Sequence, residues 1–398
     1  MSYTKVIFIV ETKFQERDYR RYGISILESN GFEVQVWECS ALLHAVYSKS
    51  YVPPDPHESE RLIRIASYEQ LAELASHLDS DTVVIQPRCR GKRYHRILRI
   101  LMHSKAKYGQ IDFGLQPGHN RQFEKSFWGR MISRVVTVVT KPKTLANRIY
   151  TKIPDRLKGL RPFDFLILGG GAAIAKRNYE IDPVKTKWLW THTLDYDLYL
   201  DMQSDPDSGT KDGDYIVYLD SYLPFHPTWQ IMGKPAPVTP DRFYGQLRKL
   251  FDYLEAQLGL PVIIAAHPRS KYHEMEEDHF GGRTLKFGET ARLVKGARLS
   301  VGHFSTSNSY NVLYRKPVIC VTTDELEASQ FSGYVESMAN MLGGKSLNID
   351  HDTQPDIERC LKIPEENYRA FHDQFIKKRG TPDVSSWQIV SDFIKTEL

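Results

Sequence analysis

The chain has 398 residues, enough for two domains of ordinary size, and 41% of them are hydrophobic. With 26% charged residues and a formal net charge of +4, its composition is typical of a globular protein and far from that of a nucleic-acid-binding one. We therefore expect no nucleic-acid partner. The mild positive charge fits an anionic ligand or contact with an anionic membrane face.

The cysteines and the N-terminal residues predict the compartment. Four cysteines are scattered without a Cys-x-x-Cys pair, and Cys39 and Cys320 fall in or beside strand-like runs, which favours reduced, buried thiols. The first residues enter a strand directly, without the basic and then apolar regions of a secretion signal. No apolar run approaches the ~18 residues of a membrane span. We expect a cytoplasmic protein, with peripheral contact at the inner membrane left open.

Strand-like runs alternate with helical patterns through the first half of the chain. Residues 5–10 form a β-branched run typical of a buried strand, and residues 17–31 show helical spacing that ends at a glycine. Further strands are expected at residues 33–39, 81–87, 109–115 and 163–171. This alternation predicts a mostly parallel, doubly wound sheet.

A polar segment, residues 203–214, contains no apolar side chain and marks a loop or a connection between domains. After it the alternation restarts, with strands expected within 215–220, 260–266, 283–288, 298–304, 317–323 and 345–350. The predicted fold class is therefore α/β, with two Rossmann-like domains and a ligand cleft between them. We expect residues 1–200 and 201–380 to form the domains, and residues 381–398 a helix that packs back on the first.

Polar side chains follow four successive strands of the second half, where ligands of open α/β sheets bind. Together they favour an anion-binding rim, in which histidines donate hydrogen bonds and an arginine contacts a phosphate or carboxylate in a bidentate manner. The residues are Asp220, Tyr222 and His226; His267, Arg269 and Ser270; His303, Ser305, Thr306 and Ser307; and Thr322, Thr323, Asp324 and Glu325.

The run of small hydroxyls from Ser305 to Ser309 has two interpretations. Such residues cap a helix, because their oxygens accept from unpaired N–H groups, and one of them suffices for that. Several hydroxyls at a helix start also suit an anion. Taken alone, the stretch favours neither.

The motifs of this half resemble those of bacterial surface-polysaccharide glycosyltransferases of the GT-B fold. In particular, the chain looks like the group with an HP motif and a later Ser/Thr motif, which includes sialyltransferases and Kdo transferases that use CMP-activated sugars. The stretches that carry the resemblance are HPRS (267–270), KFGETARLVKGARLSVGHFSTS (286–307) and KPVICVTT (316–323).

The resemblance implies that His267, Pro268 and residues 305–307 hold the phosphate and sugar end of a nucleotide-sugar donor. It also implies transfer to a capsule or lipopolysaccharide glycan, free or lipid-linked, that binds the first domain, with no metal and no further cofactor. Those enzymes carry an acidic general base in the N-terminal half, often in an Asp/Glu-Asp/Glu-Gly motif that this sequence lacks. The nearest acidic candidates are Glu11, Asp195 and Asp220.

Two other functions are compatible with the same pattern of strands and helices. A sugar-nucleotide epimerase has the same two-domain fold, and a small-molecule binding protein would need no catalytic group. Asp195 and Asp197 have the Asp-x-Asp spacing of a metal site, but we expect an exposed acidic segment there. The glycines at 169–171 lack the spacing of a dinucleotide-binding turn. We expect them to let a ligand or the second domain approach the backbone closely.

Overall fold

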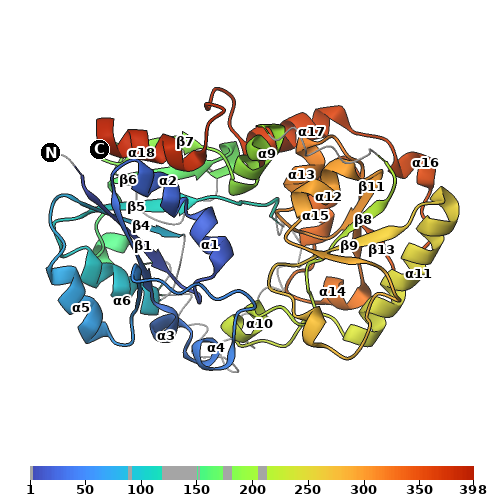
Figure 1. Ribbon diagram of the computed structural model, residues 1–398, viewed down its shortest axis with the longest axis horizontal. Helices are drawn as coiled ribbons and strands as arrows, with labels where there is room; N and C mark the ends of the chain where they lie inside the picture. Colours follow the sequence, from blue (N-terminus) through green and yellow to red (C-terminus); the bar gives the residue numbers. More distant parts are fainter. Residues whose placement is uncertain (1–2, 88–91, 119–149, 151–152, 174–181, 205–212) are drawn as a thin grey trace, which may run out of the picture.

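The computed structural model describes residues 3–87, 92–118, 150, 153–173, 182–204 and 213–398. It contains two parallel sheets in two lobes that lie side by side (Figure 1). This architecture confirms the predicted fold class.

The first sheet contains seven strands, and every neighbouring pair is parallel. Its hydrophobic strands are buried on both faces, as expected for a parallel sheet covered by helices. The spatial order is β3 (Leu62–Arg64), β2 (Glu33–Glu38), β1 (Lys5–Val10), β4 (Thr82–Pro87), β5 (Lys107–Asp112), β6 (Phe165–Gly169) and β7 (Lys187–Thr191). The three-residue strand β3 was not predicted.

The second sheet contains six strands and is also parallel. Its central strands β8 and β11 are fully buried, which places the core of this lobe beneath the predicted rim. The spatial order is β10 (Leu285–Phe287), β9 (Val262–Ala266), β8 (Ile216–Leu219), β11 (Leu299–Gly302), β12 (Val318–Thr322) and β13 (Leu347–Asn348).

Helices cover both sheets. Those before β8 are α1 (Glu16–Arg21), α2 (Ile24–Ser29), α3 (Ser40–Leu43), α4 (Ala45–Ser50), α5 (Tyr68–Ser76), α6 (Lys92–Leu101) and α9 (Leu194–Ser204), with the short turns η1 (Asp155–Lys158) and η2 (Gly171–Ala173). Those after β8 are α10 (Thr228–Met232), α11 (Pro240–Leu258), η4 (Tyr272–Glu274), α12 (Thr290–Gly296), α13 (Asn308–Leu313), α14 (Asp324–Ala328), α15 (Tyr334–Met341), α16 (Ile357–Cys360), α17 (Glu365–Phe371), η5 (His372–Ile376) and α18 (Ser386–Thr396).

The helix predicted over residues 17–31 is two helices. Gly23, between α1 and α2, has φ of +54°, in the left-handed region that glycine adopts readily. The side chain of Trp387 in α18 packs so closely there that a Cβ on Gly23 would lie 2.2 Å from its Cγ. Hydrophobic spacing alone did not reveal this break.

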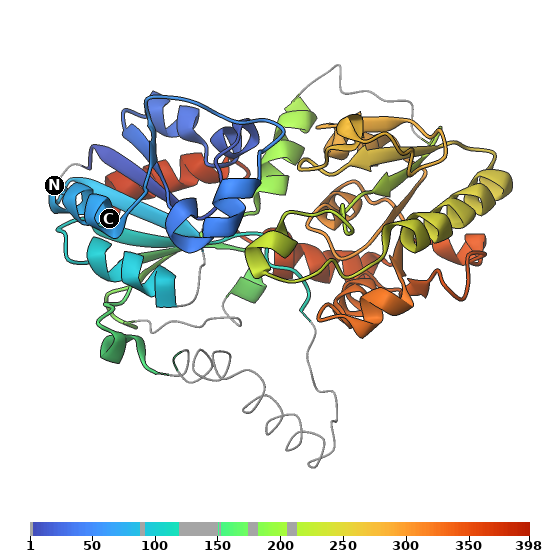
Figure 2. The ribbon, with the colours of Figure 1, turned by 90° about the horizontal axis from the view of Figure 1, so that it is seen from below.

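The C-terminal segment crosses back to the first lobe, where α18 lies in both views (Figures 1 and 2). Trp387, Val390, Phe393 and Ile394 are buried in the apolar cluster on one face of the first sheet. On the way, η5 passes Gly170, where a Cβ would lie 2.5 Å from the carbonyl oxygen of Gln374. The glycine-rich turn after β6 therefore allows a close backbone approach, as the sequence suggested.

The lobes also meet through α4 and α10, which contact each other at the lower middle of Figure 1. The Ser50 hydroxyl donates to the Gln230 side chain at 3.3 Å. On the opposite side, the N–H of Ser386 in α18 donates at 2.8 Å to Asp197 of α9, a helix that packs in the apolar cluster of the second lobe. These contacts position the ends of β8 and β9 relative to the first lobe.

Candidate functional site

The loops after β8 and β9 are joined by the buried carboxylate of Asp220. One oxygen accepts from the backbone N–H of Tyr222 at 2.8 Å, and the other accepts from the N–H of His267 and the hydroxyl of Tyr272, each at 3.1 Å. Burial raises the pKa of Asp220 to about 6, although these hydrogen bonds oppose the rise. Tyr222 is itself buried with φ of +51°, a strained conformation of the kind found at functional sites.

His267 begins a tight turn that fixes its ring. Its Nδ1 accepts from the N–H of Arg269 at 3.0 Å, and its carbonyl accepts from the hydroxyl of Ser270 at 2.6 Å. A neutral ring with Nδ1 as acceptor carries its proton on Nε2. Burial, followed by the nearby His226 and arginines, holds the pKa of His267 well below its usual range. Pro268 is exposed at the tip of the turn.

His226 repeats this arrangement beside His267. Its Nδ1 accepts from the N–H of Thr228 at 3.1 Å, and the two rings lie 4.8 Å apart in an edge-to-face arrangement. Burial, with smaller effects of Arg269 and Arg17, lowers the pKa of His226 to about 3. The loops thus offer two neutral imidazoles, each with Nε2–H as a hydrogen-bond donor.

Arg269 faces the first lobe. The positive charge of its guanidinium acts to lower the pKa values of three residues of the first lobe. These are Arg17 in α1, Tyr47 in α4 and Tyr51 directly after α4. The Nε of Arg269 is buried without a hydrogen-bond partner among the described residues. The sequence pointed to Arg269 but not to the residues opposite it.

Residues 305–307 form a turn that also approaches the first lobe. The Ser305 hydroxyl oxygen accepts from the Ser307 hydroxyl at 2.8 Å and from its N–H at 3.3 Å. The methyl group of Thr306 lies 3.6 Å from where a Cβ of Gly114, the second residue after β5, would be. The helix that follows starts at Asn308 rather than Ser305 and has six residues. Ser305 therefore stabilises the turn, and whether the run binds an anion stays a prediction.

His303 does not belong to this site. It is fully buried, its Nδ1 lies 2.7 Å from the Val321 carbonyl oxygen and its Nε2 lies 3.0 Å from the Tyr218 hydroxyl. Burial lowers its pKa to about 4. Both ring nitrogens are used within the core, so we withdraw His303 from the predicted donor-binding residues.

The end of β12 also contributes less than the sequence suggested. Thr323 caps α14 by accepting from the N–H of Leu326 at 3.1 Å. Glu325 accepts from the N–H and hydroxyl of Thr239 at 2.7 and 2.6 Å. The predicted rim therefore narrows to the loops after β8 and β9 and the turn after β11.

The three candidate bases lie in different surroundings. Asp220 is surrounded by the donors described above. Asp195 accepts from Tyr310, and desolvation raises its pKa to about 6, so it is a half-buried contact between α9 and α13 rather than part of an exposed segment. Glu11, directly after β1, keeps 42% of its side chain exposed and lies 3.5 Å from Nε2 of His44. Of the three, Glu11 is the most accessible.

Asp197 is held apart from Asp195 because it accepts from the N–H of Ser386 at 2.8 Å. In the part of the chain that the structure describes, no three His, Cys, Asp or Glu side chains converge as a metal site requires. Nor does any helix of the described residues have the length and apolar character to cross a bilayer.

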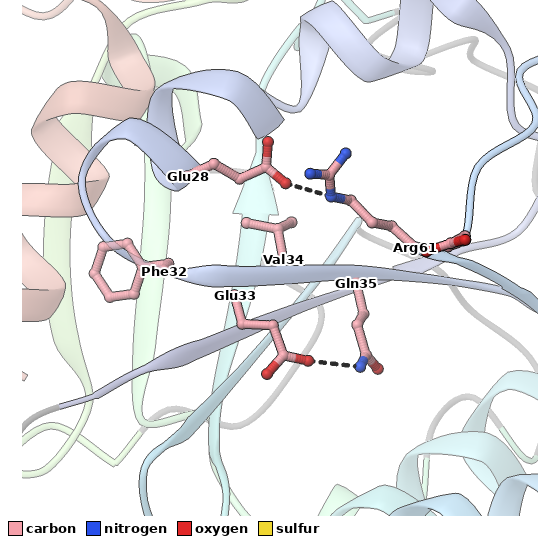
Figure 3. A pocket seen from close by; sticks show the side chains of 7 residues that line it. Glu28, Phe32, Glu33, Val34, Gln35 and Arg61 are labelled. Atoms are coloured by element: carbon pink, nitrogen blue, oxygen red, sulfur yellow. Dashed lines mark hydrogen bonds and ion pairs between the residues drawn. The ribbon is translucent and has the colours of Figure 1, made fainter.

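Two hollows lie away from the histidines. One, of about 410 Å³ at the edge of the first sheet, is lined by an ion pair between Glu28 and Arg61 and a hydrogen bond between Gln35 and Glu33 (Figure 3). The other, of about 460 Å³, lies beside α14 and is lined by residues 234–239, 325 and 328–331. Neither includes a predicted site residue other than Glu325.

Comparison with known proteins supports the architecture. No family model and no curated protein matches this chain. Among solved structures, a "glycotransferase of kitacinnamycin" matches 99% of this chain and 98% of its own at 9% identity with a TM-score of 0.53. The match to the wall teichoic acid polymerase TagF covers 98% of this chain and 88% of the polymerase chain, at 12% identity with a TM-score of 0.51. The match to a UDP-GlcNAc 2-epimerase from Methanocaldococcus jannaschii covers 93% of this chain and 99% of the epimerase chain, at 14% identity with a TM-score of 0.47. At these identities, the first two likenesses show that the chain has the two-domain GT-B fold.

Proposed function

We propose that the chain is a glycosyltransferase that moves a sugar from a nucleotide-sugar donor to a capsule or lipopolysaccharide glycan. The observation that carries the proposal is the pair of neutral, half-buried imidazoles beside Arg269, at the ends of β8 and β9 and facing the first lobe. The fold shared with a glycotransferase and a wall teichoic acid polymerase supports it.

The chemistry requires a leaving phosphate to be stabilised and an acceptor hydroxyl to be deprotonated as it attacks the sugar. The Nε2–H groups of His226 and His267 and the guanidinium of Arg269 would stabilise the phosphate as its charge develops. We assign the base to Glu11, because its side chain, directly after β1, is partly exposed and His44 lies beside it. Asp220 acts as a positioning residue that holds the His267 turn.

The experiment is a panel of CMP-, UDP-, GDP- and dTDP-sugars, read by thermal shift and by product analysis. A transferase binds a donor and hydrolyses it slowly, an epimerase interconverts the sugar, and a binding protein is only stabilised. Interconversion or binding without hydrolysis would refute the proposal.

With the preferred donor, we expect His267→Ala to lower turnover by on the order of 10²-fold while the melting temperature stays close to that of the wild type. The matched control is His273→Ala, a histidine six residues further on whose side chain is 58% exposed. Equal activity of the two variants would remove His267 from the mechanism.

The proposal also requires that transfer activity survive EDTA. A loss of activity that only Mg²⁺ or Mn²⁺ restores would contradict the metal-independent mechanism.

A further inference from the structure

Buried polar groups without partners face Arg269 from the first lobe. The Nε of Arg17 and the hydroxyl of Tyr51 are both buried and, among the described residues, have no hydrogen-bond partner. Only 7% of Tyr51 is exposed. The Nε of Arg17 also forms an ion pair with Asp18, at 3.4 Å from its Oδ1, but no hydrogen bond. Leaving such groups buried and unsatisfied costs on the order of 1–3 kcal/mol each, so native proteins rarely keep them without a reason.

The guanidiniums of Arg17 and Arg269, one from each lobe, repel each other. Burial and then Arg269 lower the pKa of Arg17 to about 10, and both arginines also act on Tyr51 and His226. Four groups from two lobes are thus within electrostatic reach of one another. An anion between them would relieve the repulsion and accept hydrogen bonds from the buried donors that have no hydrogen-bond partner among the described residues.

We propose that Arg17, Tyr51 and Arg269 form an anion subsite that bridges the two lobes and takes a phosphate group. Guanidinium groups bind phosphate through two parallel hydrogen bonds, and a phenol hydroxyl adds a neutral donor. The contact between α4 and α10 already holds the lobes together beside this subsite, so both arginines can reach one ligand in this arrangement.

The bound phosphate belongs either to the nucleotide of the donor or to the acceptor glycan. In both cases its binding requires residues from both lobes. The subsite deepens the proposed function and rests on it for the identity of the ligand. Its anion chemistry is testable without any sugar.

The test is isothermal titration of the full chain with inorganic pyrophosphate, using Arg17→Gln, Arg269→Gln and Tyr51→Phe. Loss of a charge-assisted hydrogen bond predicts that each arginine variant binds roughly 10- to 100-fold more weakly, and that the tyrosine variant loses less. Arg20→Gln is the matched control, because Arg20 lies on the same helix with 81% of its side chain exposed. It should bind as the wild type does, and thermal unfolding of each variant checks its fold.

Competition then distinguishes the sources of the phosphate. If UDP or CMP displaces pyrophosphate from the wild type, the subsite holds the phosphate of the donor. If pyrophosphate binds while the nucleotide is bound, the subsite holds a phosphate of the acceptor. Equal pyrophosphate affinity in Arg17→Gln, Arg269→Gln and Arg20→Gln would overturn the proposal. Binding that depends on Arg17 without any turnover of nucleotide sugars would instead refute the proposed function and leave the subsite in place.

Discussion

The carboxylate of Asp220 lies behind the two histidine loops and accepts from three donors, two of them backbone N–H groups. Through these bonds the single buried side chain of Asp220 fixes the backbone positions of both Tyr222 and His267. The same enclosure raises its pKa, because burial disfavours the ionised form more than the hydrogen bonds favour it. At the scale of single residues, the site is therefore positioned at a cost in stability near neutral pH.

That cost predicts how stability depends on pH. The pKa of Asp220 is about 6 in the folded protein against 3.8 as its ordinary value, so between these pH values the folded state binds more protons than the unfolded state. Stability from this group is present below pH ~4 and is lost as pH rises through 6. At 1.36 kcal/mol per pKa unit the loss is roughly 3 kcal/mol.

The measurement is the free energy of unfolding in urea at pH 4, 5, 6 and 7. In Asp220→Asn the free energy of unfolding should decline less steeply with rising pH than in the wild type. Asp241→Asn, which removes an exposed carboxylate, should decline as the wild type does. Half-buried Asp195, whose pKa is also raised, contributes equally to the proteins compared. Parallel pH profiles for wild type and Asp220→Asn would show that Asp220 is ionised in the folded state at no cost.

At the scale of elements, short helices with defined breaks direct side chains of the first lobe toward the second. α1 has six residues and ends before Gly23, which turns the chain away so that α2 can run beside α18. α1 carries Arg17, and its C-terminal residue Arg21 accepts a hydrogen bond at its carbonyl from Trp387 at 2.7 Å. A continuous helix over these residues would place the arginines differently.

Gly23→Ala should therefore be strongly destabilising. An alanine in the left-handed conformation costs about 1–2 kcal/mol, and the clash with Trp387 adds about 1–3 kcal/mol. Gly233→Ala is the matched control, because Gly233 has φ of +59° and a Cβ added there would meet nothing within 4 Å. Gly233→Ala should therefore lose only the stability that the left-handed backbone conformation costs an alanine. Denaturant unfolding of both variants measures the difference, and equal losses would mean that Trp387 moves aside freely.

At the scale of the whole molecule, the chain starts and ends in the same lobe. α18 follows the second sheet in sequence but buries its apolar face on the first (Figures 1 and 2). His192, after β7, is fully buried and lies 3.0 Å from the Ser386 hydroxyl through its Nδ1, which joins the start of α18 to the first sheet. The last helix is thus part of the core that supports α1 and its arginines.

Trp387→Ala should destabilise the first lobe in particular. Trp387 is 2% exposed and packs edge-to-face on Phe8 at 5.1 Å, so its removal should cost about 3–5 kcal/mol. By hydrogen exchange, β1 and β4 should lose protection while β8 and β9 keep theirs. Lys395→Ala, on the exposed face of the same helix, serves as the control. Uniform loss across both sheets would show that the lobes unfold as one unit.

Sequence alone determined the α/β class, the two series of strands and the polar loops after β8 and β9. These follow from local information: β-branched runs mark buried parallel strands, and the carboxyl ends of neighbouring parallel strands meet at one edge. Hence the turn at His267 and the GT-B resemblance were accessible from the chain itself. The run at 305–307 was located as well, although its helix begins three residues later.

Only the tertiary structure decided which polar groups face each other. His303 follows a strand just as His267 does, yet its ring turns into the core, because Tyr218 and the Val321 carbonyl lie there to satisfy it. Arg17 and Tyr51 carry no local signal, since a basic helix and a tyrosine after a helix are ordinary surface features. Their significance comes from the packing of two lobes distant in sequence. This packing buries the Arg17 Nε and the Tyr51 hydroxyl near Arg269, and neither atom has a hydrogen-bond partner among the described residues. Periodicity describes one face of one element, whereas a site between domains depends on how two such faces meet.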